Sequence, residues 1–312
     1  MNTRQLVFIR KSMTDFSAPI TLSTFLVGYG LILFFVATGM TNSAPDDLAT
    51  LTLYTQEQWL IGVFGQLSFV WAVGLPVMAF VTVLSARGIA AESENGTLEI
   101  LLSKPVARRQ VLLGKFLAIY IFTFLTMVAS LLLTAAVVFS LSGASPAAIG
   151  GSIFHLLPGN LVYALFVSFF LAAFGTVAAV ATGTRLRTAL AILVLPALFF
   201  AFLFLRLLPF EGLYEDYYLY LIDPSYHLGN AFVFLHELTG SEFTPETKAS
   251  LDAVTGVYDS AGITIDPLVG GMSTGVPLAG YVPPLVSTIG VIGLSIGLLA
   301  IAIVRFQRMD VQ

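Results

Sequence analysis

The chain has 312 residues, of which 57% are hydrophobic and 10% are charged, whereas about 25% of the residues of an ordinary soluble domain are charged. The small formal net charge of -4 excludes a strongly basic nucleic-acid-binding surface, so no nucleic-acid partner is expected. The absence of cysteine excludes disulfides, thiolate metal sites and cysteine nucleophiles. This composition indicates a chain that lies mostly in a lipid bilayer.

Six apolar stretches are long enough to cross the membrane, since a hydrocarbon core of about 30 Å requires roughly 20 residues in helical form. They cover residues 20–39, 59–84, 116–141, 161–182, 189–208 and 283–304. We therefore predict an all-α membrane protein in which residues 1–312 form a single transmembrane domain. Only Arg206 is a charge within these limits, and its position near the end of a span lets the side chain extend to the headgroups. A functional intramembrane arginine is the alternative.

Basic residues are distributed very unequally when the connections are assigned to alternating sides of the membrane. One side has Arg4, Arg10, Lys11, Arg87, Lys104, Arg108, Arg109, Lys115, Arg185, Arg187, Arg305 and Arg308. The other side has only Arg206 and Lys248, together with most of the acidic residues. Because basic residues near span ends tend to stay in the cytoplasm, we predict a multi-pass protein of the cell membrane with both termini cytoplasmic and a long extracytoplasmic loop at 209–282.

The residues before the first span predict a helix that lies at the membrane interface. The apolar positions at helical spacing are Leu6, Ile9, Met13 and Phe16. A cleaved signal peptide is the alternative, although the first apolar stretch is longer than is typical for one. Further along the chain, Pro76 and Pro196 predict kinks in the second and fifth spans. Gly293 and Gly297 form a pair of small residues that favours close packing of the sixth span within the chain over packing against a partner.

The connection between the second and third spans, residues 85–115, has the most pronounced pattern in the sequence. Asn95 and Gly96 predict a turn, and a short amphipathic helix follows. Its apolar face consists of Leu98, Leu101 and Leu102, with Glu99 and Ser103 elsewhere on the helix. Pro105 ends this helix and begins the next one. Basic residues are then expected to hold the third span at headgroup level: they are Arg108, Arg109 and Lys115.

This connection resembles the signature of type-2 ABC export permeases, in which a glutamate precedes Gly-Thr-Leu-Glu, followed by Leu-Leu-Ser, Pro-Val, Arg and Gly-Lys. The residues at matching positions are Glu92, Gly96, Thr97, Leu98, Glu99, Leu101, Leu102, Ser103, Pro105, Arg108, Gly114 and Lys115. That family, which includes the permeases of multidrug-type and copper-enzyme-maturation systems, also has six spans with both termini inside. The resemblance therefore extends over nearly the whole chain.

The resemblance implies that the short helix is a coupling helix, which seats in a groove of a separate ATPase subunit. The residues implied in this contact are Glu92, Gly96, Thr97, Leu98, Glu99, Leu101, Leu102, Ser103, Pro105 and Arg108. The expected assembly contains two ATPase copies with bound ATP and Mg²⁺, and a second permease copy that makes a homodimer or a related heterodimer. No cofactor is expected on this chain. An amphipathic helix that only lies on the lipid surface is the alternative.

The sequence offers no energy source of its own. None of the six predicted spans contains Asp, Glu, His or Lys, so proton coupling within the bilayer is difficult to build. A phosphate-binding loop is also missing, because Gly114-Lys115 lacks the glycine that the motif requires five residues earlier. We therefore predict a non-catalytic subunit of an exporter whose ATPase is another chain. The apolar spans suit a lipid-like or amphipathic cargo, or transmission of force without cargo.

Other motifs give weaker signals. Asp223-Pro224 resembles an Asp-Pro element that such permeases often have before a short helix, and a simple helix-capping turn is the alternative. Gly271 to Gly275 fits a serine-hydrolase pattern, but Gly293 to Gly297 fits it too within a membrane span, which indicates chance. His155, His227 and His236 lack metal-ligand spacing, so no catalytic or metal site is expected. From another class, the alternative function is a membrane scaffold or assembly factor whose loop at 209–282 docks an extracytoplasmic protein.

Overall fold

The computed structural model describes residues 14, 16, 19–41, 48–97, 107–207, 211–260 and 276–308, and these residues are helical apart from turns and one isolated bridge between Tyr258 and Leu278. The longer helices are α2 (Pro19–Thr41), α3 (Leu53–Leu67), α4 (Leu75–Ser85), α7 (Arg108–Ser142), α9 (Ile153–Thr182), α10 (Arg185–Leu207), α12 (Pro224–Leu238), α13 (Pro245–Thr255) and α14 (Pro284–Gln307). The short elements are η1 (Leu48–Thr50), η2 (Ser68–Ala72), η3 (Ala86–Ala90), α5 (Ala91–Glu94), α8 (Ala148–Gly151), α11 (Glu211–Asp216) and η4 (Leu219–Leu221).

The predicted all-α membrane fold is confirmed. Within the part of the chain that the structure describes, six helical segments are long and apolar enough to cross a membrane: Leu22–Thr41, Leu53–Glu94, Arg108–Ser142, Ala148–Thr182, Arg185–Arg206 and Pro284–Gln307. Each corresponds to one of the six predicted spans. Several extend well beyond them, and α7 with its 35 residues is about 52 Å long, so it projects past a hydrocarbon core of about 30 Å.

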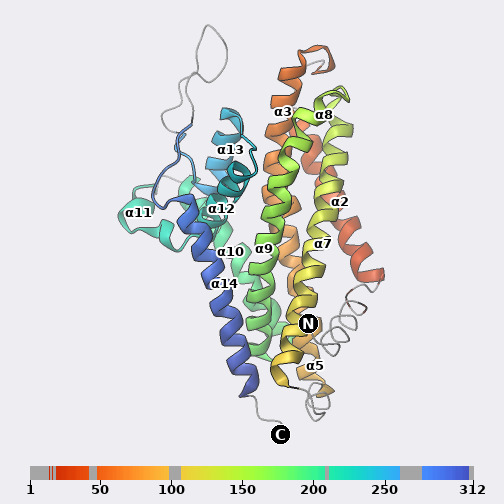
Figure 1. Cartoon of the computed structure of the whole chain (residues 1–312), viewed down its shortest axis with the longest axis vertical. Coiled ribbons are helices and arrows are strands. Elements are labelled where there is room, and N and C mark those ends of the chain that lie inside the picture. The colour runs from red at the N-terminus through yellow and green to blue at the C-terminus, as the bar shows by residue number, and fades with distance from the viewer. Residues whose placement is uncertain are drawn as a thin grey trace.

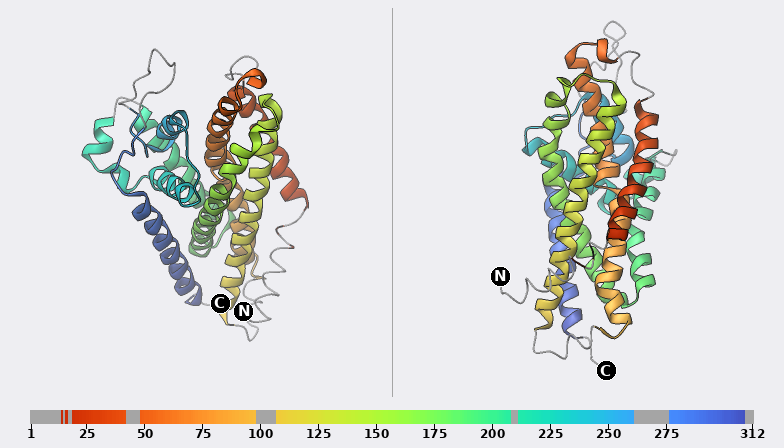
Figure 2. Two further views of the ribbon diagram at one scale, coloured as in Figure 1. Left: turned by 45° about the horizontal axis from the view of Figure 1, so that its top comes forward. Right: turned by 90° about the vertical axis from the view of Figure 1, so that its right-hand side faces the viewer.

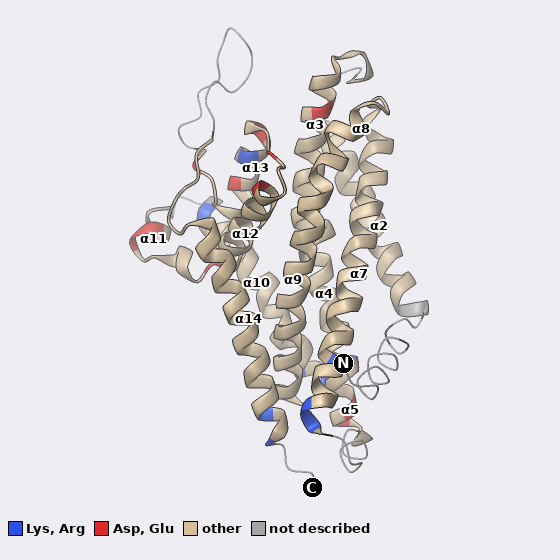
Figure 3. Ribbon diagram, in the orientation of Figure 1, with Lys and Arg blue, Asp and Glu red and all other residues tan. Residues whose placement is uncertain are grey.

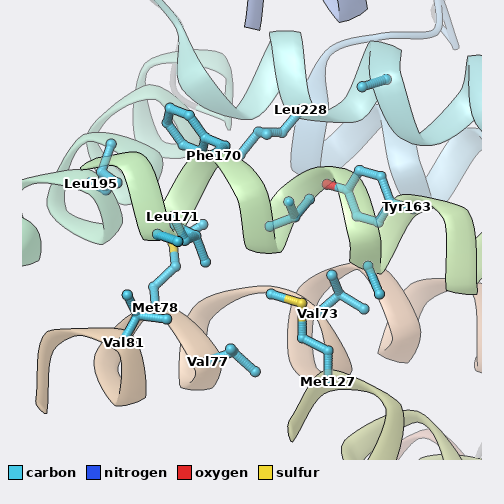
Figure 4. Close-up of a cluster of buried hydrophobic side chains, with 14 of the residues drawn as sticks. Val73, Val77, Met78, Val81, Met127, Tyr163, Phe170, Leu171, Leu195 and Leu228 are labelled. Atoms are coloured by element: carbon cyan, nitrogen blue, oxygen red, sulfur yellow. The ribbon is translucent and has the colours of Figure 1, made fainter. Parts of the chain in front are cut away.

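Helix α9 lies at the centre of the bundle, with α7 on one side and α14 and α12 on the other (Figures 1 and 2). Figure 4 shows buried side chains of α4 and α9 packed face to face, with Leu195 of α10 and Leu228 of α12 completing the cluster. Val77, Leu171 and Met127 in this cluster are fully buried. The core thus depends on side chains from five helices, most of which are far apart in the sequence.

The second span is interrupted rather than kinked as predicted for Pro76. Helix α3 passes into the π-helical turn η2, a turn follows at Val73 and Gly74, and α4 begins anew at Leu75. Pro76 lies in the first turn of α4, where backbone N–H groups have no acceptor within the helix. The N–H that proline lacks therefore costs no helical hydrogen bond. A Cβ on Gly74 would lie 2.3 Å from the Val70 carbonyl oxygen, so the break requires glycine. Pro196, by contrast, lies within the continuous helix α10.

The peripheral helices expose apolar faces. Large exposed side chains include Leu31 and Phe35 on α2, Leu190 and Phe204 on α10, and Ile289 and Ile296 on α14. Gly293 and Gly297 were expected to pack within the chain, and this expectation was wrong. No described atom lies within 4 Å of a Cβ built at either glycine, because α14 turns this face away from α9. In a membrane these faces contact lipid or another copy.

Charged residues are segregated at the two ends of the bundle (Figure 3). The end with α5 and the C-terminus of α14, called here the basic end, contains Arg87, Arg108, Arg109, Lys115, Arg185, Arg187, Arg305 and Arg308 among the described residues. The opposite end, called here the acidic end, contains α11, α12 and α13 and most described Asp and Glu residues. This separation agrees with the assignment of loops made from the sequence.

Arg206 is nearly buried, and it closes the acidic end of α10 onto α12. Its guanidinium pairs with the fully buried Asp223 and also donates to Ser225 Oγ at 3.1 Å and to the Val254 carbonyl. Asp223 in turn caps α12 by accepting from Ser225 N at 2.8 Å, so the helix-capping interpretation of Asp223-Pro224 is confirmed. A buried cation needs this pairing, since an isolated charge loses its hydration.

His236 is buried between α12 and α9. Its Nδ1 donates to the Phe232 carbonyl at 2.8 Å, and a Cβ on Gly159 of α9 would lie 2.4 Å from its ring. Burial lowers the pKa of His236 from 6.5 to about 4, because the imidazolium would lose its hydration. The side chain is therefore neutral at pH 7 and packs as an aromatic group against Phe232 and Phe243.

Substitution of Gly74 tests the interruption of the second span. Gly74→Ala forces a methyl group against the Val70 carbonyl, and we expect the free energy of unfolding to fall by about 1–3 kcal/mol. Gly290→Ala on the open face of α14 is the matched control, because nothing described lies within 4 Å of the added atom. Thermal unfolding of the purified protein in nanodiscs measures both. Equal melting temperatures for the two variants would contradict the assigned break.

His236 makes stability depend on pH. The unfolded state binds a proton with a pKa near 6.5 and the folded state only near 4, so stability is complete above pH 6.5 and decreases as pH falls toward 4. We expect a loss of about 2 kcal/mol between pH 7.5 and pH 5 from this residue. The contribution of His236 is measured by comparing the stability of wild type and His236→Gln in thermal unfolding at pH 7.5 and at pH 5. A pH-independent difference would show that the imidazole is not buried in the neutral form.

Candidate functional site

The connection between the second and third spans lies at the basic end. The predicted turn is present: α5 ends at Glu94 with Asn95 as its C-cap, Gly96 takes a left-handed conformation with φ 70°, and Thr97 Oγ1 donates to the Glu92 carbonyl at 3.2 Å. Apart from its first residue, Thr97, the predicted coupling helix falls outside the described residues. So do the implied ATPase contacts Leu98, Glu99, Leu101, Leu102, Ser103 and Pro105, which stay predictions.

Lys115 and Glu92 join the two ends of this connection. Lys115 Nζ lies 2.7 Å from Glu92 Oε2 and donates to the Gly88 carbonyl at 2.6 Å. The lysine side chain is only 4% exposed, so it does not hold α7 at headgroup level as predicted from the sequence. It points inward because η3, which packs against α7, supplies the Gly88 carbonyl, and the adjoining α5 supplies the Glu92 carboxylate.

The turn η3 has a second neighbour from the N-terminal segment. Phe16 is buried, its ring lies 2.7 Å from the position of a Cβ on Gly88, and its centroid is 6.0 Å from that of Phe122 on α7. The rest of the predicted interfacial helix, residues 1–13, lies outside the described residues. Gly88 therefore admits an aromatic ring on one side of η3 while its carbonyl binds Lys115.

Charged side chains at the basic end bind the termini of three other helices. The Glu94 carboxylate accepts from the backbone N–H of Arg185 at 3.3 Å, at the start of α10. Arg108 donates to the Gln307 carbonyl at 3.1 Å, at the end of α14, and Arg305 donates to the Ala181 carbonyl at 3.0 Å, at the end of α9. Each charge has the sign that favours its helix terminus: negative at an N-terminus, positive at a C-terminus.

The structure thus brings together only some of the implied site residues. Glu92, Gly96, Thr97 and Arg108 lie on the two described flanks of the connection. Glu94, Arg185 and Arg305 also belong to this network and were missed as site residues, because their partners are up to 124 residues away in the sequence. No local pattern could reveal them, although Arg185 and Arg305 were among the basic residues assigned to the cytoplasmic side.

The acidic end offers no metal centre among the described residues, where no three His, Asp or Glu side chains gather. His155 lies near Ser241 and Glu242, and His227 hydrogen-bonds Ser287 and the Leu221 carbonyl at 3.0 Å each. His155 and His236 are neighbours whose backbone carbonyls both accept from Ser241, whereas His227 lies nine residues earlier than His236 on α12. Ser273 of the serine-hydrolase pattern lies outside the described residues.

The fold and charge distribution define a polytopic α-helical membrane protein. The sequence model of the ABC-2 family transporter proteins matches residues 70–311, and the chain therefore belongs to this family. Its members are membrane subunits of ABC transporters, so this chain is a permease subunit and an ABC ATPase is its implied partner. A comparison with curated proteins gave no match.

The buried ion pair at the basic end can be tested by a double-mutant cycle. Lys115→Met or Glu92→Gln leaves a charge without its partner, and we expect each to lower the free energy of unfolding by about 3 kcal/mol. The double variant should lose less than the sum by at least about 1 kcal/mol. Arg185→Met is the control, because its pair with Glu94 is exposed and contributes at most about 1 kcal/mol. Additive losses would show that Lys115 and Glu92 act independently.

Proposed function

We propose that this chain is the membrane half of an ATP-driven exporter, with the basic end in the cytoplasm and residues 97–103 bound to a separate ATPase subunit. The excess of Lys and Arg at one end supports this orientation, because basic residues near span ends are retained in the cytoplasm. The signature between Glu92 and Lys115 supports the ATPase contact. The Glu92 carboxylate and the Lys115 ammonium group of this signature pair with each other, and this pair holds the two flanks of the connection together.

The network at the basic end is the observation that supports coupling. Glu92 and Lys115 tie α5 to α7, Glu94 ties α5 to α10, and Arg108 ties α7 to α14. A displacement of the connection by the ATPase therefore reaches three spans through direct contacts. Helix α4 leads from there to the break at Gly74, where the second span is free to change direction without breaking a continuous helix.

The proposed complex contains two permease copies and two ATPase copies. The apolar faces of α2, α10 and α14 are exposed along much of their length, which leaves room for a second copy and for a path between the copies. A heterodimer with a related permease would use the same faces. ATP and Mg²⁺ are bound by the partner ATPases in this proposal, and this chain binds no cofactor.

The proposed cargo is lipid-like or amphipathic. The chain has few polar side chains on its membrane faces, whereas a hydrophilic ion would need polar groups to replace its hydration shell. Stimulation of the ATPase of the purified complex by amphipathic compounds would support this cargo class. Stimulation only by a small hydrophilic ion would contradict it.

Substitutions in the predicted coupling helix test the proposed function. Leu98→Asp with Leu101→Asp places two charges in an apolar contact, and we expect the ATPase to be lost on co-purification together with transport. Leu238→Asp is the matched control, because Leu238 is 67% exposed at the opposite end of the bundle. The control variant should retain both the co-purifying ATPase and transport.

Two results would contradict the proposal. The first is that no ATPase ever co-purifies with wild type while a protein bound to residues 209–282 does, which supports a scaffold instead. The second concerns orientation: a cysteine at Lys104 should be protected from membrane-impermeant thiol reagents in intact cells. Labelling of this cysteine from outside the cell would show that the topology is the reverse of the proposed one. The chain has no cysteine of its own, so the signal would be unambiguous.

A further inference from the structure

The segment from Leu213 to Ile222 forms a closed protrusion at the acidic end. Arg206, near the end of α10, and Asp223, at the start of α12, pair at its base. The Tyr214 hydroxyl donates to Asp223 at 2.9 Å and therefore fixes the first turn of α11 to the same base. Figure 1 shows α11 projecting sideways from the bundle. The protrusion is thus held in place by buried polar contacts.

Aromatic contacts fix the depth of this protrusion relative to the spans. Tyr220 stacks on Tyr281 with centroids 4.7 Å apart and an interplanar angle of 11°, and Tyr281 comes three residues before α14 begins. Tyr214 packs on Phe202 of α10 at 6.4 Å. Helix α14 has 24 residues, about 36 Å, and so only slightly exceeds a core of about 30 Å. Its first turn, and the protrusion beside it, therefore lie at headgroup level.

The protrusion exposes large apolar and aromatic side chains. They are Leu213 (43% exposed), Tyr217 (68%), Tyr218 (62%), Leu221 (56%) and Ile222 (68%). Tyr218 is the only non-glycine residue with positive φ in the described part of the chain, and its φ of 54° bends the backbone between α11 and η4. Tyrosine is enriched where membrane spans meet the headgroups, because its ring is apolar and its hydroxyl is polar.

We propose that this protrusion is a membrane anchor that inserts into the headgroup region of the leaflet at the acidic end. The ends of α10 and α14 that adjoin the protrusion also expose apolar side chains, among them Phe204, Leu285 and Val286. Residues 211–222 contain three acidic residues and no Lys or Arg, so the anchor binds by burial of apolar surface rather than by attraction to anionic lipids. Only the naming of this leaflet as the outer one rests on the proposed function.

The anchor gives the bundle a fixed point outside the spans. Through the base of the protrusion it connects the membrane surface to α10 and α12, and through the Tyr220–Tyr281 stack it connects to the start of α14. The acidic end is therefore held at a constant depth while the basic end is free to be displaced.

Nitroxide labels at single cysteines test the anchor in the full chain reconstituted in nanodiscs of zwitterionic lipid. The labelled positions are Tyr217→Cys and Ile222→Cys, both exposed, with Glu246→Cys on α13 as the control at the same end. We expect the ratio of accessibility to oxygen over accessibility to a water-soluble nickel chelate to be severalfold higher at 217 and 222 than at 246. High salt and anionic lipid should leave the ratios unchanged.

Either of two other outcomes overturns the proposal. Ratios at 217 and 222 equal to that at 246 would place the protrusion in water. Low accessibility to both reagents would place it in a contact between protein copies instead. Because the measurement requires neither ATPase nor cargo, its result is independent of whether the proposed transport function holds.

Discussion

The structure depends on the requirement that every backbone N–H and C=O within hydrocarbon be hydrogen-bonded inside the protein. This requirement makes the spans helical and restricts where a helix can be interrupted. The break in the second span satisfies it because Val73 N closes the π-helical turn η2 by donating to Ser68 O at 3.0 Å, Met78 N opens α4 by donating to Gly74 O at 3.2 Å, and Pro76 has no N–H to leave unpaired. The break is also packed inside the bundle rather than exposed to lipid, next to the buried α4 and α9 cluster.

The same cost of burying polar groups explains both internal ion pairs. Lys115 with Glu92 at the basic end and Arg206 with Asp223 at the acidic end each combine a nearly buried cation with a carboxylate and a backbone carbonyl. Each pair also joins segments at a functional boundary. The first joins the two flanks of the predicted ATPase-binding connection, and the second joins the last residues of α10 to the cap of α12. The described ion pairs thus lie at the two ends of the bundle, and the buried polar side chains between them are uncharged.

This arrangement suits a subunit that receives motion at one end. At the basic end, charged side chains bind helix termini of α9, α10 and α14, so the separate spans are mechanically linked there. Between that end and mid-membrane, α4 is a helix of 11 residues bounded by two π-helical turns, η2 and η3. At the acidic end, the base of the protrusion and the His236 packing hold α12 against α10 and α9.

The sequence by itself determined the membrane location, the number of spans, the separation of charge and the family resemblance, because length, hydropathy and loop charge are properties of contiguous segments. It also located the turn at Asn95-Gly96 and the cap at Asp223. Only the tertiary structure decided that Lys115 and Arg206 are buried in ion pairs, that Gly293 and Gly297 face outward, and that Glu94 binds α10. Those outcomes depend on which helix faces which, and a partner 91 residues away leaves no trace in local periodicity.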